Sequence, residues 1–568
     1  MRKFFFILCS LAMASAVVGL VRGIGAMVDG NWSALGDSDL LWIQWSNDIG
    51  IKRMLLSVPI ALLLLKLVGQ TRPLSLFQNW RAALICTSIA LLPHLMAEIK
   101  VPDSSTKPSI VLITLDSVRL DFLGWGGSEL PTSPKLDALA AKGVRFTQNI
   151  SQSSWTKPST ATLLTGLVPS KHHANSRYGP LANSQRTLAE ALSLDGYRTT
   201  CYSSNPNITP TFGFMQGFDF IHHDVASTAT ELIASGKQWL DSADKRASFL
   251  YLHLNDAHYP YEPSSEYAGM FNKTGIDAFL DGSAEIKFRN SFGETFSEGQ
   301  VESLKLSYAE EIKYLDDVVG DFVNELLNSR DDIIVIITAD HGEEFLEHGD
   351  LGHGHTVYDE LIRIPLQFVA SNKLMGENDW QIGVHQQQVR QMDVLPTILE
   401  MCSLGWPNEI RPLDGESLLP FFRETQGEHE HRQAISETDS QGSALSGMAG
   451  PLRSFRLPSS KLIIGDPWTE AISNRVWLFN LLADPRETNN LAQSDLDEVK
   501  SMRGKYDASG WLLPTFYNSS ARVTMSENEK AQLAEMGYSD DGEDAAADYD
   551  PYFDPRAIPW VELKISSD

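Results

Sequence analysis

The sequence predicts an α/β domain with a mostly parallel central sheet flanked by helices. Three runs of apolar, largely β-branched residues carry this prediction: 109–115, 248–254 and 332–338. Such runs are typical of strands that are buried on both faces. A helical stretch, 306–327, separates the second run from the third. Strands that alternate with helices favour a parallel sheet covered on both sides.

Short local signals predict further elements. A helix is expected to begin at Pro134, because Ser133 is a favoured N-cap residue and proline suits the first helical position. Gly143 is expected to end this helix. Near the C-terminus, residues 477–480 (Trp-Leu-Phe-Asn) predict another strand, and residues 539–568 contain an acidic stretch typical of a solvated tail.

The composition excludes several classes of protein. The chain has 568 residues, a formal net charge of −27 and 43% apolar residues, so it is globular rather than disordered throughout. It is too long for a single small domain, since roughly 100–200 residues per domain are usual. Such an acidic chain without a basic stripe is not expected to bind nucleic acid. Its 4 cysteines show no C-x-x-C spacing of the kind found in metal sites.

The first hundred residues are predicted to anchor the chain in a membrane. Apolar stretches occupy 4–21, 54–65 and 82–96. We interpret residues 1–100 as one to three transmembrane helices, although the second and third stretches are each shorter than the roughly 20 residues of a typical span. A signal peptide cleaved after Ala14-Ser-Ala16, followed by apolar helices, is the alternative interpretation.

Basic residues near these stretches predict the orientation of the chain. With three spans, Arg2, Lys3, Arg72 and Arg81 would remain on the cytoplasmic side. Everything after residue 100 would then lie on the extracytoplasmic side. The pair at 52–53, Lys-Arg, argues the other way.

Each of the three predicted strands ends in acids or histidines. Asp116 follows the first, Asp256 and His258 follow the second, and Asp340 and His341 follow the third. In parallel sheets, ligands bind beyond the carboxyl ends of the strands, so we expect these side chains to converge. Carboxylate and imidazole together are ligands for Zn, Mn or a related divalent ion.

Several segments of the chain resemble the sulfatase branch of the alkaline phosphatase superfamily, over roughly residues 108 to 540. The segments that carry the resemblance are 110–119, 131–140, 155–166, 205–219, 256–258, 340–365, 413–420 and 479–491. The resemblance implies an alkaline-phosphatase-like catalytic domain over 108–420 and a smaller antiparallel C-terminal subdomain over 421–538. It also implies a metal-dependent ester hydrolase.

The nucleophile position departs from the family pattern. Sulfatases of this branch carry Cys-x-Pro-Ser-Arg, or Ser in place of Cys, and this residue becomes formylglycine. Here the segment 156–160 reads Thr-Lys-Pro-Ser-Thr, and threonine cannot be converted in that way. A single acid, Asp116, follows the first strand where the family has a pair, which removes one calcium ligand, and His341 stands where many sulfatases have Asn. These changes point to threonine-nucleophile relatives: phosphodiesterases, phosphonate hydrolases and phospho-headgroup transferases.

Thr156 is the predicted nucleophile. A threonine hydroxyl needs activation near neutral pH, and a divalent ion (Zn, Mn or Ca) held by Asp116, Asp340 and His341 would supply it, with Thr156 as a further ligand. Lys157 would add positive charge beside the substrate. The alternative is that Thr156 merely caps a helix around Ala161 to Leu164.

The remaining candidates are histidines. His258 and His353, favoured over His355, are expected either to complete a second metal site with Asp256 or to protonate the leaving oxygen, for which His258 is the preferred residue.

Three functions remain open from the sequence. The first is a membrane-anchored, metal-dependent hydrolase of phosphate (diester) or sulfate esters, for which an anionic ester is the partner. The second is a transferase of a phospho-headgroup from a lipid donor, which the membrane anchor motivates. The third is a non-catalytic binding protein that keeps the fold, which the missing Cys and Arg motivate. The oligomeric state and the non-reacting part of the substrate are not predicted.

Overall fold

The computed structural model describes residues 106–176, 179–242, 244–273, 296–406, 412–423, 431–438, 442–443, 448–449, 451–465, 475–509, 511 and 525–535. Contacts divide the chain into a unit up to Asp103 and a unit from Ser104 onward, and all described residues belong to the second. The predicted membrane-anchoring region and the acidic tail lie outside the described residues. Among the described helices, none has the length and apolarity needed to cross a bilayer.

The domain is built on a sheet of eight strands in the order β10-β2-β9-β6-β1-β5-β3-β4. Its strands are β1 (Ser109–Leu115), β2 (Val144–Ile150), β3 (Arg198–Ser203), β4 (Phe220–His223), β5 (Ser248–Leu254), β6 (Ile333–Ala339), β9 (Arg363–Ala370) and β10 (Gly383–Arg390). β9 is antiparallel to both of its neighbours, β6 and β2. The other strands all run in one direction, so the predicted mostly parallel sheet is confirmed.

Two of the three strands predicted from apolar runs, β1 and β5, have the predicted bounds, and β6 begins one residue later than expected. The predicted helix after Ser133 is α5 (Pro134–Ala140). The long helix α11 (Glu298–Ser329) begins earlier than the expected 306, because Ser297 and Gln300 form a capping box at its start.

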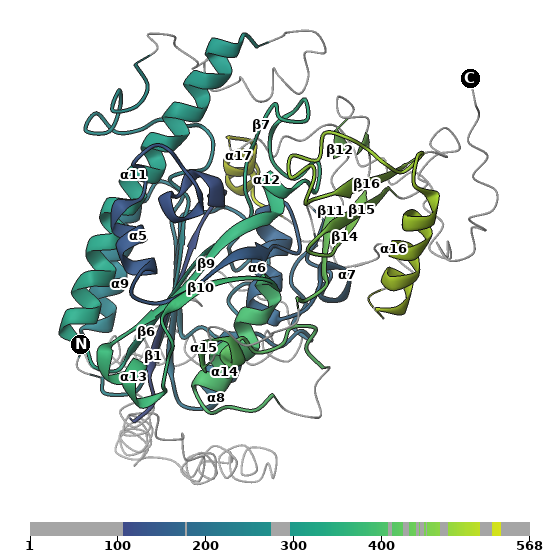
Figure 1. Cartoon of the computed structure of the whole chain (residues 1–568). Coiled ribbons are helices and arrows are strands. Elements are labelled where there is room, and N and C mark those ends of the chain that lie inside the picture. Colours follow the sequence, from purple (N-terminus) through teal and green to yellow (C-terminus); the bar gives the residue numbers. More distant parts are fainter. Residues whose placement is uncertain are drawn as a thin grey trace, which may run out of the picture. The chain divides into compact units, whose positions relative to one another are not determined.

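Helices cover both faces of this sheet (Figure 1). Ile110 and Leu112 of β1 pack in one apolar cluster, with residues of α6 (Thr156–Thr165), α8 (Leu188–Leu194) and α14 (Val394–Met401). The alternate residues Val111, Ile113 and Leu115 pack in the other, with α5, α9 (Ala229–Leu240) and α11. Because successive side chains of a strand point to opposite faces, a fully apolar strand requires these two layers.

A second sheet forms the C-terminal part, as expected. It is antiparallel, in the order β11-β14-β15-β16, and α16 (Leu496–Ala508) packs on it. Its strands are β11 (Ala434–Thr438), β14 (Leu452–Arg456), β15 (Ser460–Gly465) and β16 (Val476–Asn480), the last of which contains the strand predicted at 477–480.

The remaining elements are short. They are η3 (Leu120–Phe122), η4 (Gly124–Gly126), α7 (Pro169–His172), β7 (Glu344–Phe345), β8 (Leu351–Gly352), α12 (Asp359–Ile362), α13 (Asn372–Glu377), η5 (Gln391–Asp393), α15 (Leu419–Arg423), β12 (Gly442–Ser443), β13 (Met448–Ala449) and α17 (Glu527–Glu535).

Candidate active site

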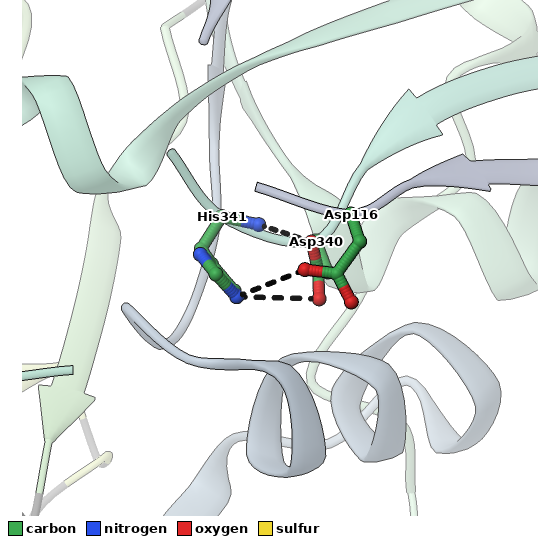
Figure 2. A group of neighbouring side chains, drawn as sticks. All are labelled: Asp116, Asp340 and His341. Atoms are coloured by element: carbon green, nitrogen blue, oxygen red, sulfur yellow. Dashed lines mark hydrogen bonds and ion pairs between the residues drawn. The ribbon is translucent and has the colours of Figure 1, made fainter. Parts of the chain in front are cut away.

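Three predicted metal ligands converge at the carboxyl edge of the central sheet. Asp116 follows β1, and Asp340 and His341 follow the adjacent strand β6. Figure 2 shows the side chains turned toward one another above a helix. All three are fully buried, and they form a group with the spacing that one metal ion requires.

The atoms that face one another in this group suit a divalent cation. Nε2 of His341 lies 3.4 Å from Oδ2 of Asp340 and 3.7 Å from Oδ1 of Asp116. Both oxygens are buried without a hydrogen-bond partner among the described residues. Nδ1 of His341 lies 2.8 Å from the carbonyl oxygen of Gly342, to which it donates, so in the neutral ring Nε2 carries the lone pair. Two orphaned carboxylate oxygens beside an imidazole lone pair fit the predicted ion.

The two carboxylates differ in their surroundings. Oδ1 of Asp340 accepts from the amides of Ser117 (3.1 Å) and His341 (2.9 Å), which leaves Oδ2 for the ion. Burial and the charge of Asp116 raise the pKa of Asp340. Burial alone would also raise the pKa of Asp116, but a hydrogen bond from His253 and the nearby imidazoles lower it to about 2. The two like charges repel each other, and a bound cation would relieve that repulsion.

Thr156 lies beside this group. Its Oγ1 is 3.3 Å from Nε2 of His341, and its side chain is buried. The alternative that Thr156 caps a helix starting near residue 161 is wrong, because α6 begins at Thr156 itself and the N-cap is Trp155. Pro158 fits the first turn, where its missing N–H is not needed. Thr156 therefore stands at the positive end of the helix, next to the candidate ligands.

Lys157, the second predicted catalytic residue, is fully buried in this helix turn. Its Nζ lies 3.9 Å from the ring centroid of Phe212 and 5.6 Å from that of Trp155. Cation–π contacts of this kind hold the ammonium group close to the N-terminus of α6.

His258 and His353 are brought to the same place. The ring centroids of His341 and His353 are 4.2 Å apart, and those of His258 and His353 are 4.8 Å apart. Nδ1 of His353 contacts Oε1 of Glu343 at 3.0 Å, and Nδ1 of His258 contacts the carbonyl oxygen of Tyr259 at 2.7 Å. Each imidazole is thus oriented through Nδ1.

The structure does not bring Asp256 into this cluster. Its Oδ1 accepts from the amide of Ala229, the first residue of α9, at 3.0 Å, and burial raises its pKa to about 6. Among the described residues, neither group with metal-binding spacing contains Asp256, His258 or His353. The first turn of α9 satisfies one oxygen of this carboxylate instead.

Several residues at the site were not singled out from the sequence. His253 and Asn205 both contact Oδ2 of Asp116. Glu343 is buried against His353, and Glu344 is buried against His355 (2.8 Å). The sequence signal that could have identified His253 was its position as a histidine inside the otherwise apolar strand 248–254.

A second group with metal-binding spacing consists of Glu344, His348 and Glu360. Both ring nitrogens of His348 face acceptors, with Nδ1 at 2.6 Å from Glu360 and Nε2 at 3.0 Å from the carbonyl oxygen of Arg486. Although burial opposes it, Glu360 raises the pKa of His348 to about 9. Because both ring nitrogens already contact acceptors, His348 links this group to the C-terminal part through Arg486.

The C-terminal sheet supports both loops of the site. Thr438 Oγ1 donates to the carbonyl oxygen of Gly354 at 2.6 Å, beside His353. Ser436 Oγ donates to the carbonyl oxygen of Ser151 at 2.6 Å, in the segment that leads to Thr156. β11 thereby connects the segment from Ser151 to Thr156 with the loop that carries His353, here called the histidine loop.

Comparisons with known proteins agree with this architecture. A family model described as Sulfatase matches residues 108–403. The multifunctional alkaline phosphatase superfamily protein PehA of Trinickia caryophylli is 25% identical over 480 residues, which cover 68% of this chain and 91% of that protein. The choline-sulfatase of Rhizobium meliloti (strain 1021) is 21% identical over 447 residues, which cover 68% and 83%.

One solved structure of similar fold is the phosphonate monoester hydrolase of Agrobacterium radiobacter. The similarity has a TM-score of 0.58 and 21% identity, and it covers 74% of this chain and 100% of that chain. At this identity the similarity shows the fold, and it confirms the predicted architecture.

Proposed function

The chain belongs to the sulfatase family, and we propose that it cleaves phosphorus esters through Thr156 with the help of one divalent metal ion. Its relatives are hydrolases of sulfate or phosphate esters. We therefore do not propose that the chain is a non-catalytic binding protein. The observation that carries the proposal is the position of Thr156 Oγ1, 3.3 Å from His341 Nε2 within the buried acid–histidine cluster.

Each residue of the site has a separate role in a two-step reaction. A bound ion supplies positive charge that polarises the ester and lowers the pKa of the Thr156 hydroxyl. Thr156 Oγ1 attacks phosphorus and releases its proton to water, the bond to the leaving oxygen breaks, and a phosphothreonine forms. The leaving oxygen takes a proton from His258, or from His353. Water then attacks the phosphothreonine and gives a proton to the same imidazole. The Thr156 oxygen leaves and takes a proton from water, which restores the hydroxyl.

Two features of α6 support negative charge at this place. The amides of its first turn point toward the nucleophile end, where helix termini favour anions. Lys157 places an ammonium group within the same turn. An anionic ester therefore meets compensating charge although the chain as a whole carries −27.

Zn or Mn is the proposed ion. An imidazole among the ligands favours these metals, whereas Ca prefers six to eight oxygen ligands. Thr156 and two carboxylates with His341 make a small, mixed N/O set.

We further propose that residues 1–100 anchor the enzyme in a membrane, with the catalytic domain on the extracytoplasmic side. The apolar stretches and the flanking basic residues support this proposal. Transfer of a phospho-headgroup from a lipid donor is the second candidate function, and the proposed membrane anchor is the feature that motivates it. Labelled headgroup that appears on an added alcohol rather than in water would favour it.

The decisive comparison uses purified full-length protein loaded with Mn²⁺ or Zn²⁺ and two substrates, an aryl phosphodiester and an aryl sulfate. We expect cleavage of the phosphodiester, loss of cleavage after chelation, and loss in Thr156→Ala. Thr165→Ala is the matched control, since Thr165 lies in the last turn of the same helix and donates to Ala161. Cleavage of the sulfate alone would overturn the preference for phosphorus, and full activity in Thr156→Ala would overturn the nucleophile.

A further inference from the structure

His253 contacts Oδ2 of Asp116, and its Nε2 also lies 3.9 Å from Oδ2 of Asp340. It lies in β5, opposite Thr114 of β1, and its side chain is fully buried. Nε2 of His253 is 2.8 Å from Oδ2 of Asp116. The amide of Asp116 continues the ladder by donating to the carbonyl oxygen of Leu254 at 2.9 Å. The register of the two strands therefore fixes the imidazole beside the carboxylate.

The two oxygens of Asp116 have different surroundings. Oδ2 accepts from two donors, Nε2 of His253 and, at 2.6 Å, Nδ2 of Asn205. Oδ1 has no hydrogen-bond partner among the described residues and lies 3.7 Å from Nε2 of His341. Rotation of the carboxylate would break both bonds to Oδ2, and hydrogen bonds to a charged group are stronger than those between neutral groups. Oδ1 is therefore held toward the candidate ion.

Tyr251 holds the other nitrogen of the same ring. Its hydroxyl lies 2.9 Å from Nδ1 of His253 and 3.3 Å from Oγ1 of Thr114. Tyr251 and His253 are two residues apart in β5, so they share one face of the strand. Because the carboxylate only accepts, Nε2 must donate, and the hydroxyl of Tyr251 fixes the plane of the ring.

We infer that His253, oriented by Tyr251, is a positioning residue that presents Oδ1 of Asp116 to the catalytic ion. The inference rests on the proposed metal-dependent function and adds to it a chain of contacts from Tyr251 to the ligand. Loss of partners that orient metal ligands typically weakens metal binding about 10–100-fold. A histidine with a merely structural role would not change metal affinity according to which of its nitrogens is replaced.

The test compares two substitutions of similar polarity in the full chain. His253→Gln places an amide nitrogen near the position of Nε2, whereas His253→Asn places one near Nδ1, out of reach of Asp116. We expect Mn²⁺ affinity, measured by calorimetric titration, within about threefold of the parent for His253→Gln and about 10–100-fold weaker for His253→Asn. Equal affinities of His253→Asn and the parent would overturn the inference.

Controls separate folding from positioning. His172 is also fully buried but contacts Thr162 (3.1 Å), so His172→Asn and His172→Gln should both keep the parent affinity. Should His253→Asn fail to fold, Tyr251→Phe decides, with an expected loss of about threefold to tenfold and with unchanged affinity as the contrary result.

The outcomes also separate this inference from the proposed function. Full hydrolysis by Thr156→Ala would overturn the assignment of Thr156 as the nucleophile. It would leave the inference about His253 unaffected. A parent chain that binds neither Mn²⁺ nor Zn²⁺ would overturn both.

Discussion

Oγ1 of Thr156 lies 3.3 Å from Nε2 of His341, so the first residue of α6 meets a residue that follows β6. This contact joins a helix N-terminus, a candidate metal ligand and a hydroxyl at one point. Thr156→Val keeps the shape of the side chain but removes the hydroxyl, and it should lower kcat by roughly 10⁴-fold or more. Thr156→Ser keeps the hydroxyl and should retain measurable turnover. The check is steady-state hydrolysis of an aryl phosphodiester at saturating metal.

Asp340→Asn should raise the thermal stability of the metal-free protein and abolish most of the stabilisation by added metal. In the parent, a bound ion stabilises the fold by about 2.7 kcal/mol at a concentration one hundred times Kd. The substitution removes one ligand charge and the repulsion between Asp340 and Asp116, so the metal-free variant should unfold at a higher temperature than the metal-free parent. Added Mn²⁺ should then change its Tm little. Asp331→Asn, at an exposed position, should keep the parent response to metal.

His348 should make stability depend on pH above neutrality. Its pKa rises to about 9, although burial opposes the shift, because Glu360 accepts from Nδ1. A raised pKa in the folded state gives stability that is fully present below the usual value of 6.5 and is lost as pH rises through 9. We expect the parent to lose on the order of 2 kcal/mol more than His348→Gln between these limits, in urea unfolding at a series of pH values. A parallel pH dependence of the two proteins would contradict the assignment, and His222→Gln is the matched control.

Thr438 should affect catalysis from outside the ligand group. Its hydroxyl donates to the carbonyl oxygen of Gly354, next to His353. Thr438→Val removes this bond, at a cost of about 1 kcal/mol in the free energy of unfolding, and should lower kcat more than it raises KM because His353 loses its position. Thr438→Ser should keep both values near the parent. Unchanged kcat in Thr438→Val would show that the C-terminal sheet does not position the histidine loop.

The fold and the candidate ligand group could be predicted because their signals are local. The apolar runs at 109–115 and 248–254 are strands with those bounds, and the residue after each strand lies at one edge of a parallel sheet by geometry alone. Asp116, Asp340 and His341 converge for this reason. The antiparallel direction of β9 could not be predicted, because a buried central strand reads alike in either direction.

Residues that act through register or loop packing escaped prediction. His253 contacts Asp116 only because β5 pairs with β1 in a particular register, which one strand alone does not reveal. Asp256 follows its strand as expected, yet its Oδ1 accepts from the amide of Ala229 in the first turn of α9, and it belongs to neither group with metal-binding spacing among the described residues. Thr156 was expected to precede its helix by several residues, because the Pro158 within α6 obscured the start.

The stereochemical course at phosphorus tests the role of Thr156 most directly. The substrate is an aryl phosphorothioate diester of known configuration, hydrolysed by the metal-loaded enzyme in isotopically labelled water. Attack by Thr156 followed by attack of water consists of two in-line displacements, so we expect net retention of configuration. Net inversion, which a single direct attack by water produces, would contradict it.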